Sequence, residues 1–160
     1  MPRYLLGSQC LVDIARRVQS PAEQWFATAG ERGIDASDVY ISAVTPMILR
    51  STFKAAAPSP TVTAIRENSE NLVNRFARSR QLAPVTQEIA DRWGQLLDFD
   101  LSRETADGET KLYRFQEKLV LATAIEGLDG RPFVLVDKRQ SAHDKLAPLG
   151  LDLEDPYELA

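Results

Sequence analysis

The chain has 160 residues, 44% of them apolar and 26% charged, which is the composition of one ordinary globular domain. No apolar run reaches the roughly 18 residues that a membrane span needs, and a single cysteine with a single histidine excludes an internal disulfide and a Cys/His zinc site. The net charge of −4 is unevenly spread, because residues 1–80 carry more basic than acidic side chains and residues 81–160 carry the reverse. The N-terminus lacks a signal-peptide pattern, so we expect a cytoplasmic protein of one domain, residues 1–160, with no membrane contact.

The first half of the chain alternates strand and helix signals. Ser20, Pro21 and Glu23 have the spacing of a helix start, with a capping hydroxyl, a proline in the first position and an acid in the third. The two prolines of AAAPSP (55–60) interrupt a helical pattern. The elements expected here are a strand at Arg3–Leu6, helices at Cys10–Val18 and from Ser20 to about Ala29, a strand at Asp38–Ser42, and helices at Thr45–Lys54 and Thr61–Arg80.

The second half continues the alternation. The unbroken apolar run FVLV indicates a buried strand, and SRETADGET indicates a polar loop. The expected elements are a strand at Leu82–Val85, a helix capped by Thr86, a loop at Ser102–Thr110, a helix at Leu112–Glu126 with Phe115 on its apolar face, a strand at Phe133–Val136, and a last short strand or extended tail toward residues 154–160.

Strands that alternate with helices predict an α/β protein. We expect a central parallel sheet of about four or five short strands, flanked by helices on both faces. Active sites of such folds lie at the carboxyl ends of the strands. The triplet that follows the first strand, Gly7-Ser8-Gln9, carries no charge.

The order of these landmarks resembles a PIN domain of the VapC or FitB toxin type. The resemblance rests on YLLGSQCLVDIARR, where the family reads like YLLDTNVLIDLLR, and on YISAVTPMILR, QLAPVTQEIADRWGQLL and EKLVLATAIEG followed by FVLVD. It covers almost the whole chain and implies a bacterial toxin–antitoxin context. It also implies a single PIN-like domain with the α/β architecture described above.

The family cleaves RNA with Mg²⁺ or Mn²⁺ held by three or four carboxylates, and such hard cations require oxygen ligands. Carried across by position, the first family acid falls on Gly7, the following Thr and Asn on Ser8 and Gln9, and the second acid on Ile48. The third acid falls on Glu117, and the last family positions on Asp137 and Arg139. The resemblance therefore implies a vestigial pocket in which no residue is assigned a catalytic role.

We expect no cofactor at this pocket. If a metal binds, its ligands would be Glu117, Asp137 and Asp144, and the ion would be Mg²⁺ or Mn²⁺. Replacing clustered carboxylates also relieves their mutual repulsion. Ser8, Gln9, Lys138 and Arg139 are candidates to hold a phosphate or carboxylate, against the alternative that Ser8 and Gln9 are simply buried and hydrogen-bonded.

Several other residues receive structural interpretations. Cys10 is expected to be a buried, inert thiol, and Asp13 to pair with Arg16 or Arg17. His143 beside Asp144 is expected on the surface, because Ser141 is too close in sequence to complete a catalytic triad.

Three functions follow from this reading. The preferred one is a non-catalytic PIN-like protein that binds a protein partner, either an antitoxin-like peptide or a second copy in a homodimer, or that binds RNA without cleaving it. The alternatives are an active Mg²⁺- or Mn²⁺-dependent endoribonuclease toxin with a rearranged acidic site, and a structural or regulatory oligomeric subunit. Any RNA contact is expected to be salt-dependent and to involve Arg75, Arg78 and Arg139.

Overall fold

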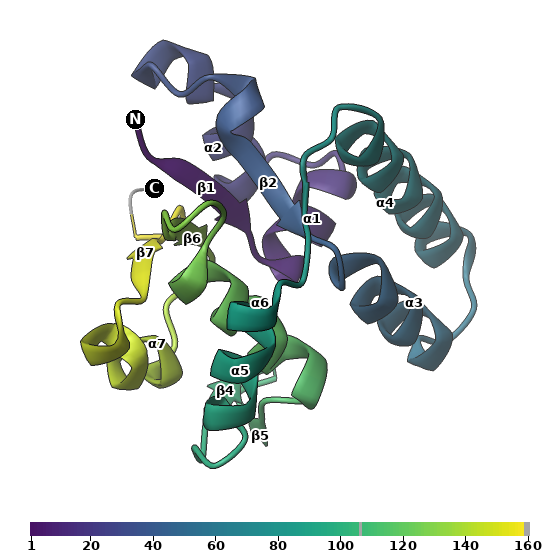
Figure 1. The fold of residues 1–160 in the computed structure, drawn as a ribbon. Coiled ribbons are helices and arrows are strands. Elements are labelled where there is room, and N and C mark those ends of the chain that lie inside the picture. The colour runs from purple at the N-terminus through teal and green to yellow at the C-terminus, as the bar shows by residue number, and fades with distance from the viewer. Residues whose placement is uncertain (106, 159–160) are drawn as a thin grey trace.

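The computed structural model describes residues 1–105 and 107–158. Its centre is a five-stranded sheet in the order β3-β2-β1-β6-β7, in which every neighbouring pair is parallel. The strands are β1 (Arg3–Leu6), β2 (Val39–Ser42), β3 (Leu82–Ala83), β6 (Phe133–Val136) and β7 (Asp152–Glu154). The predicted α/β fold with a short-stranded parallel sheet is confirmed (Figure 1).

Helices connect the strands, and the predicted caps Ser20 and Thr86 are confirmed, whereas the cap at Ser59 was not predicted. The hydroxyls of Ser20, Ser59 and Thr86 each accept a hydrogen bond from the backbone N–H three residues on. The helices are α1 (Ser8–Ala15), α2 (Pro21–Ala27), α3 (Thr45–Ala55), α4 (Pro60–Arg78), α5 (Gln87–Leu96), α6 (Phe115–Glu126) and α7 (Ser141–Leu146). Short 3-10 turns occupy Ala29–Arg32, Ala36–Asp38 and Ala147–Leu149.

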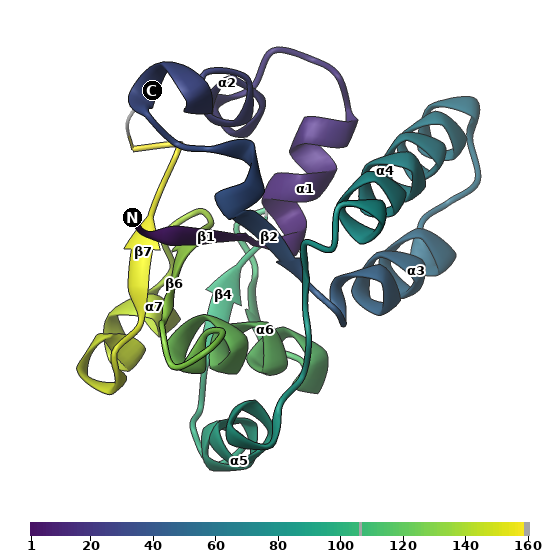
Figure 2. The same cartoon turned by 45° about the horizontal axis from the view of Figure 1, so that its top comes forward.

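The sheet separates two apolar cores. Leu5 and Leu135 pack on one face with α5, α6 and α7, whereas their neighbours Leu6 and Val136 pack on the other face with α1, α2 and α4. This alternation follows from the two-residue period of a strand. Figures 1 and 2 show the α3–α4 pair projecting from one side of the molecule.

The prediction of an irregular loop at Ser102–Thr110 is wrong, because this segment contains paired strands. Strand β4 (Ser102–Glu104) pairs antiparallel with β5 (Thr110–Leu112), and the turn between them contains an Asp-Gly dipeptide, a common hairpin signal. Because β5 includes Leu112, helix α6 begins only at Phe115. Phe115 is 68% exposed and does not contribute to the core. Ala106, inside the predicted loop, lies outside the described residues.

The C-terminal segment folds back onto the sheet. The predicted last strand is β7, and the residues after it do not form the alternative extended tail, because Asp155 and Pro156 are buried. The Tyr157 hydroxyl donates a hydrogen bond to Asp13, which also pairs with Arg16 at 3.6 Å as expected. Residues 159–160 of the predicted tail lie outside the described part of the chain.

Within residues 1–105 and 107–158, no helix is both long and apolar enough to cross a membrane. All five strands of the sheet run in the same direction, so their carboxyl ends meet at one edge. Gly7 follows β1 there, Asp137 follows β6 and Asp155 follows β7.

Candidate functional site

Gly7 and Asp137 lie side by side at the carboxyl edge of the sheet. The Gly7 N–H donates to the Val136 carbonyl at 2.9 Å. A Cβ built on Gly7 would lie 2.8 Å from Cγ of Asp137, closer than real Cβ contacts. The backbone of Gly7 is extended, with φ −66° and ψ 155°, which any residue adopts. The Asp137 side chain, and not the backbone, therefore leaves no space for a side chain at position 7.

The Asp137 carboxylate is 23% exposed and has one hydrogen bond, in which the Lys138 N–H donates to Oδ1 at 2.8 Å. The pKa of Asp137 is raised to about 7, mainly by burial and also by the charge of Asp155, whereas the Lys138 N–H and Arg103 act in the opposite direction. Asp137 is thus an acid whose charge is poorly stabilised by the surrounding protein.

His143 faces Asp137 from α7, which corrects the prediction that this histidine lies on the surface. Its side chain is buried, its Nδ1 accepts the Gln140 N–H at 2.8 Å, and its Nε2 lies 3.9 Å from Oδ2 of Asp137. Burial lowers the pKa of His143 to about 4, and nearby Arg139 lowers it as well. With Nδ1 accepting, the neutral ring carries its proton on Nε2, which has no hydrogen-bond partner within the described structure.

Glu117 lies at the third position of α6, and both of its oxygens are engaged. Oε2 accepts the Arg114 backbone N–H at 3.1 Å, which helps to cap the helix, and Oε1 lies 3.1 Å from Nη2 of Arg103 on β4. Ile48, on α3, lines the same pocket as Glu117 and is 8% exposed. Glu117, the residue matched to the third family acid, thus already binds a cation and a backbone amide of its own chain.

Tyr113 connects Asp137 and Glu117 electrostatically. Burial raises the pKa of the Tyr113 hydroxyl, Asp137 and Glu117 raise it further, and Arg103 opposes them. The predicted pocket residues Gly7, Ile48, Glu117 and Asp137 are therefore at the carboxyl edge, joined there by Tyr113, Arg103 and His143.

Other predicted site residues are placed differently. Ser8 is half-buried, and Gln9 is exposed and donates to Asp13 at 3.1 Å, so the two are not a buried pair. The Arg139 guanidinium is bonded to Asp144 at 3.0 Å and to Glu158 at 2.9 Å. Two carboxylates thus already bind the cation that was expected to hold an anion.

The geometry does not fit the divalent cation that the resemblance implies. Among residues 1–105 and 107–158, no three His, Cys, Asp or Glu side chains are arranged to hold a metal ion. Glu117 is paired with Arg103, and Asp144 with Arg139, so neither carboxylate is directed with Asp137 at a common point. We derive no catalytic step through a metal at this edge.

Cys10, on α1, is fully buried, and burial raises the pKa of its thiol well above the usual value. This agrees with the prediction of an inert thiol, since the thiolate is the reactive form.

The arginines predicted to contact RNA are not brought together. Arg75 and Arg78 lie in the last turn of α4, which leads into the start of β3, and the Arg75 guanidinium covers the Phe26 ring at 5.9 Å. Arg139 follows the end of β6, at the opposite edge of the parallel sheet. A continuous basic surface that includes all three is not formed.

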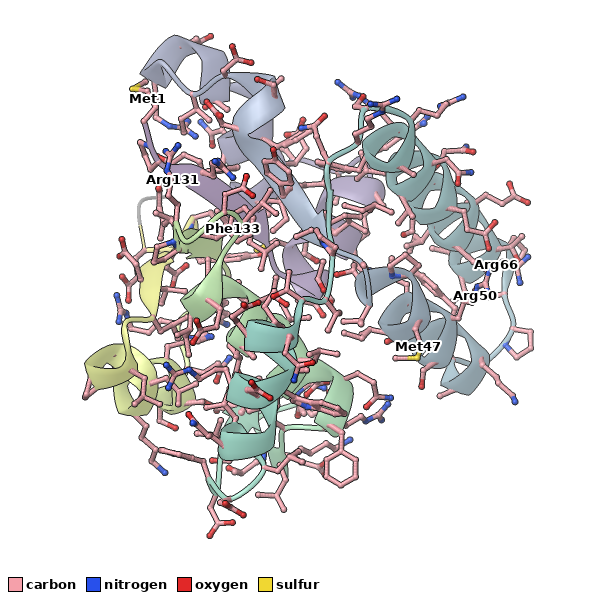
Figure 3. The ribbon with its side chains drawn as sticks, viewed as in Figure 1. Met1, Met47, Arg50, Arg66, Arg131 and Phe133 are labelled. Carbon is pink, nitrogen blue, oxygen red and sulfur yellow. The ribbon has the colours of Figure 1, made fainter. Side chains whose placement is uncertain are left out.

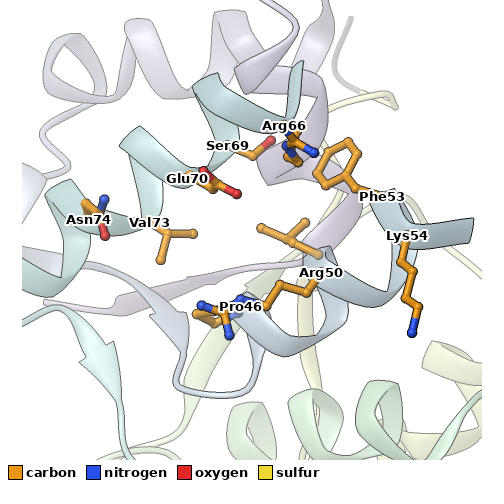
Figure 4. A pocket seen from close by; sticks show the side chains of 10 residues that line it. Pro46, Arg50, Phe53, Lys54, Arg66, Ser69, Glu70, Val73 and Asn74 are labelled. Atoms are coloured by element: carbon orange, nitrogen blue, oxygen red, sulfur yellow. The ribbon is translucent and has the colours of Figure 1, made fainter. Parts of the chain in front are cut away.

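A groove of about 540 Å³ lies between α3 and α4. Leu49, Phe53 and Val73 are among its apolar lining residues. Figure 4 shows Phe53 from α3 and Glu70 and Val73 from α4 directed into the space between the helices. Arg50 and Arg66 lie on the two facing helices (Figure 3), and neither makes an ion pair with any described residue.

No family model matches the sequence, and no curated protein matches it. Solved structures do match. A chain of FitAB bound to a DNA fragment has a TM-score of 0.62 at 16% identity, covering 96% of this chain and 95% of that one. A chain of FitAcB from Neisseria gonorrhoeae gives 0.58 at 14% identity, covering 96% and 98%. A chain of DNA-bound VapBC from Salmonella typhimurium gives 0.60 at 15% identity, covering 98% and 99%.

The fold is that of a VapC/FitB-like PIN domain. The match extends over nearly the whole length of both chains, so the PIN fold accounts for the sheet and the helices around it. At such low identity the likeness concerns the fold, and the function has to be argued from the residues at the site.

Proposed function

We propose that this PIN-fold protein is non-catalytic and acts by binding a protein partner. The observation that carries the proposal is the engagement of its acids from within the chain. Glu117 is held by Arg103 and the Arg114 N–H, and Asp137 fills the space that a side chain at position 7 would need. A carboxylate bound in this way offers no free oxygen pair to a hard cation.

The neighbouring structures support a protein partner, because another match, VapBC-5 from Mycobacterium tuberculosis, is described as a member of a family of toxin-antitoxin systems. The α3–α4 groove is the surface that we assign to such a partner. Its apolar lining residues suit the apolar face of a helix, and the guanidiniums of Arg50 and Arg66, which have no ionic partner among the described residues, suit acidic side chains at the edges of that helix.

We also propose self-association at the start of α6. Leu112 and Phe115 are 69% and 68% exposed, and large apolar side chains exposed close together commonly mark contact surfaces. Light scattering during gel filtration should give the mass of a homodimer for the native protein and a lower mass for Phe115→Ser. A native monomer would refute the dimer without affecting the proposal of a partner.

An RNA-cleavage assay tests the absence of catalysis. The native protein and Glu117→Gln are incubated with a labelled mixed-sequence RNA in Mg²⁺ or Mn²⁺, and we expect equal, background cleavage from both. Metal-dependent cleavage that is lost in Glu117→Gln would instead establish the endoribonuclease with a rearranged site. A cytoplasmic location and RNA binding without cleavage remain predictions that accompany this proposal.

A matched pair of variants on α4 tests the groove. Arg66→Glu reverses a charge that lines it, whereas Arg78→Glu makes the same change in the last turn of the same helix, outside the groove. With a purified partner, we expect Arg66→Glu to weaken binding by on the order of tenfold and Arg78→Glu to leave it unchanged. Equal affinities for both variants would remove the groove as the partner site.

A further inference from the structure

A second, smaller pocket of about 170 Å³ lies between α3, β4 and the start of α6. We call it the α3–α6 pocket. Its polar side chains come from Ser51 and Thr52 of α3, Arg103 of β4, and Arg114, Gln116 and Glu117 at the start of α6. Its volume equals that of about five or six water molecules, which suits a tetrahedral anion with part of its hydration.

The pocket carries excess positive charge. Arg103 and Arg114 both line it, and Glu117 is the only acid among the residues that do. Both Glu117 oxygens already accept protein donors, so its negative charge offsets one guanidinium and leaves the other.

Arg114 supplies the guanidinium without a counter-charge. Its contact is a 3.5 Å approach of Nη1 to the Ser51 hydroxyl, at the limit of a hydrogen bond, and it makes no ion pair with any described residue. Arg103 pairs with Glu117 through Nη2, but its Nε is buried and has no hydrogen-bond partner in the described structure. Donors left over in this way are the feature that an anion would complete.

The backbone also contributes positive potential to the pocket. Helix α6 has 12 residues, and its amino end, beginning at Phe115, borders the pocket through Arg114 and Gln116. The partial positive charge at a helix N-terminus favours an anion beside the first N–H groups. Two guanidiniums, a hydroxyl and a helix N-terminus thus converge on one small pocket.

We propose that the α3–α6 pocket binds a phosphoryl group, with Arg114 and Arg103 as its principal donors. Guanidinium groups bind phosphate oxygens through charge-assisted hydrogen bonds. The inference rests on the proposed function, because Glu117 must remain paired with Arg103 and not serve a metal. It differs from the sequence-based anion site, whose Arg139 is already bonded to two carboxylates.

The test is a titration of the ¹⁵N-labelled protein with inorganic phosphate in metal-free buffer at constant ionic strength. We expect saturable shifts of the Gln116 and Ser51 amides. Arg114→Gln should weaken binding by on the order of tenfold, the usual cost of one charge-assisted hydrogen bond. Arg78→Gln removes an equal charge from the far end of α4 and should leave binding unchanged.

Ser51→Glu provides a second variant that does not disturb the Arg103–Glu117 pair. It brings a carboxylate to the Arg114 guanidinium and should abolish the shifts. Saturation that is equal in the native protein, Arg114→Gln and Ser51→Glu would overturn the proposal, as would the absence of saturable shifts in the native protein.

Two oligoribonucleotides of one sequence, one with a 5′-phosphate and one with a 5′-hydroxyl, separate the sources of the phosphoryl group. Arg114-dependent binding of the first alone assigns a terminal phosphate, and equal Arg114-dependent binding of both assigns the backbone. Because these titrations contain no metal, their failure leaves the cleavage assay unaffected, and metal-dependent cleavage would defeat the proposed function separately.

Discussion

Charged side chains form ion pairs within the chain at the carboxyl edge of the sheet, whereas the arginines of the α3–α4 groove do not. At the edge, Glu117 is bound by Arg103, and Arg139 is bound by Asp144 and Glu158. In the groove, Arg50 and Arg66 have no ionic partner among the described residues.

This difference separates side chains whose charges are already paired within the chain, at the edge, from arginines in the groove that are free to contact another molecule. An ion pair within the chain fixes the geometry of its two members, and removing one member leaves the other uncompensated. A solvated cation beside an apolar groove costs little in the free protein and can contribute affinity and rate of association with an acidic partner. The comparison therefore predicts large stability effects at the edge and small ones in the groove.

The largest effect is expected from Gly7→Asp, which returns an acid to the end of β1. Its Cβ would overlap the Asp137 side chain and place two carboxylates together, so we expect the free energy of unfolding to fall by about 3 kcal/mol or more. Chemical denaturation measures this. Gly94→Ala, which adds a Cβ with no atom within 4 Å, is the control and should be neutral or stabilising.

The exchanged pair Gly7→Asp with Asp137→Gly sharpens this test. If the two positions share one space, the double variant should recover most of the stability that Gly7→Asp loses. A double variant no more stable than Gly7→Asp would show that another contact excludes a side chain at position 7.

The next effect is a pH dependence carried by Asp137. Its pKa of about 7 exceeds the usual 3.8, so between these values the folded chain holds a proton that the unfolded chain releases. Stability contributed by this group is therefore lost as the pH rises from about 4 to about 7. Asp137→Asn should equal the native protein near pH 4 and exceed its unfolding free energy by on the order of 2 kcal/mol near pH 8.

His143 contributes with the opposite sign, which is why the prediction is a difference between two proteins. Its pKa of about 4 lies below the usual 6.5, so its contribution is lost as the pH falls from about 6.5 to 4. The native protein and Asp137→Asn both lose this His143 contribution, so it cancels in the stability difference between them. A stability difference between the two proteins that does not change between pH 4 and pH 8 would contradict the raised pKa of Asp137.

A smaller effect is expected from Arg103→Gln, which leaves Glu117 without its cation. Because the Arg103 side chain is 34% exposed, we expect a loss of about 1 kcal/mol in unfolding free energy. The double variant Arg103→Gln with Glu117→Gln should recover part of it, and thermal unfolding measures both. A double variant that is less stable than the single would show that Glu117 contributes mainly through the cap of α6.

The smallest effects belong to the groove. Arg50→Ala and Arg66→Ala remove exposed side chains that have no ionic partner within the described chain, so each should change the unfolding free energy by less than about 0.5 kcal/mol. Denaturation of both variants checks this. A loss above about 1 kcal/mol would mean that these arginines stabilise the α3–α4 pair itself, and the contrast between the two regions would disappear.

Local signals in the sequence were sufficient for most of the fold. The Ser20 cap, the apolar FVLV strand and the Thr86 cap all lie in elements where they were expected, because each depends on neighbouring residues. The β4–β5 hairpin was missed because its strands are short and polar, although Asp107-Gly108 is a turn signal that could have indicated it. Helix α7 was missed because six residues carry too little periodicity to be recognised.

Less of the site than of the fold could be predicted from the sequence, because the contacts of the site join residues that are far apart in the chain. Gly7 and Glu117 were identified by position, but no local pattern shows that the Asp137 side chain occupies the space beside Gly7. Arg103 lies on strand β4 of the hairpin, so missing the hairpin also concealed its pair with Glu117. His143 was expected on the surface because no catalytic triad could be completed around it, whereas α7 turns the ring into the interior.

The most direct measurement is a calorimetric titration of the metal-free protein with Mn²⁺, carried out in parallel on Glu117→Gln. Mn²⁺ shares the preference of Mg²⁺ for oxygen ligands and binds more tightly. The account predicts no saturable heat from either protein, because Glu117 is held by Arg103 and no described carboxylates converge with it. Saturable heat in the native protein that disappears in Glu117→Gln would contradict it and show that the edge still binds metal.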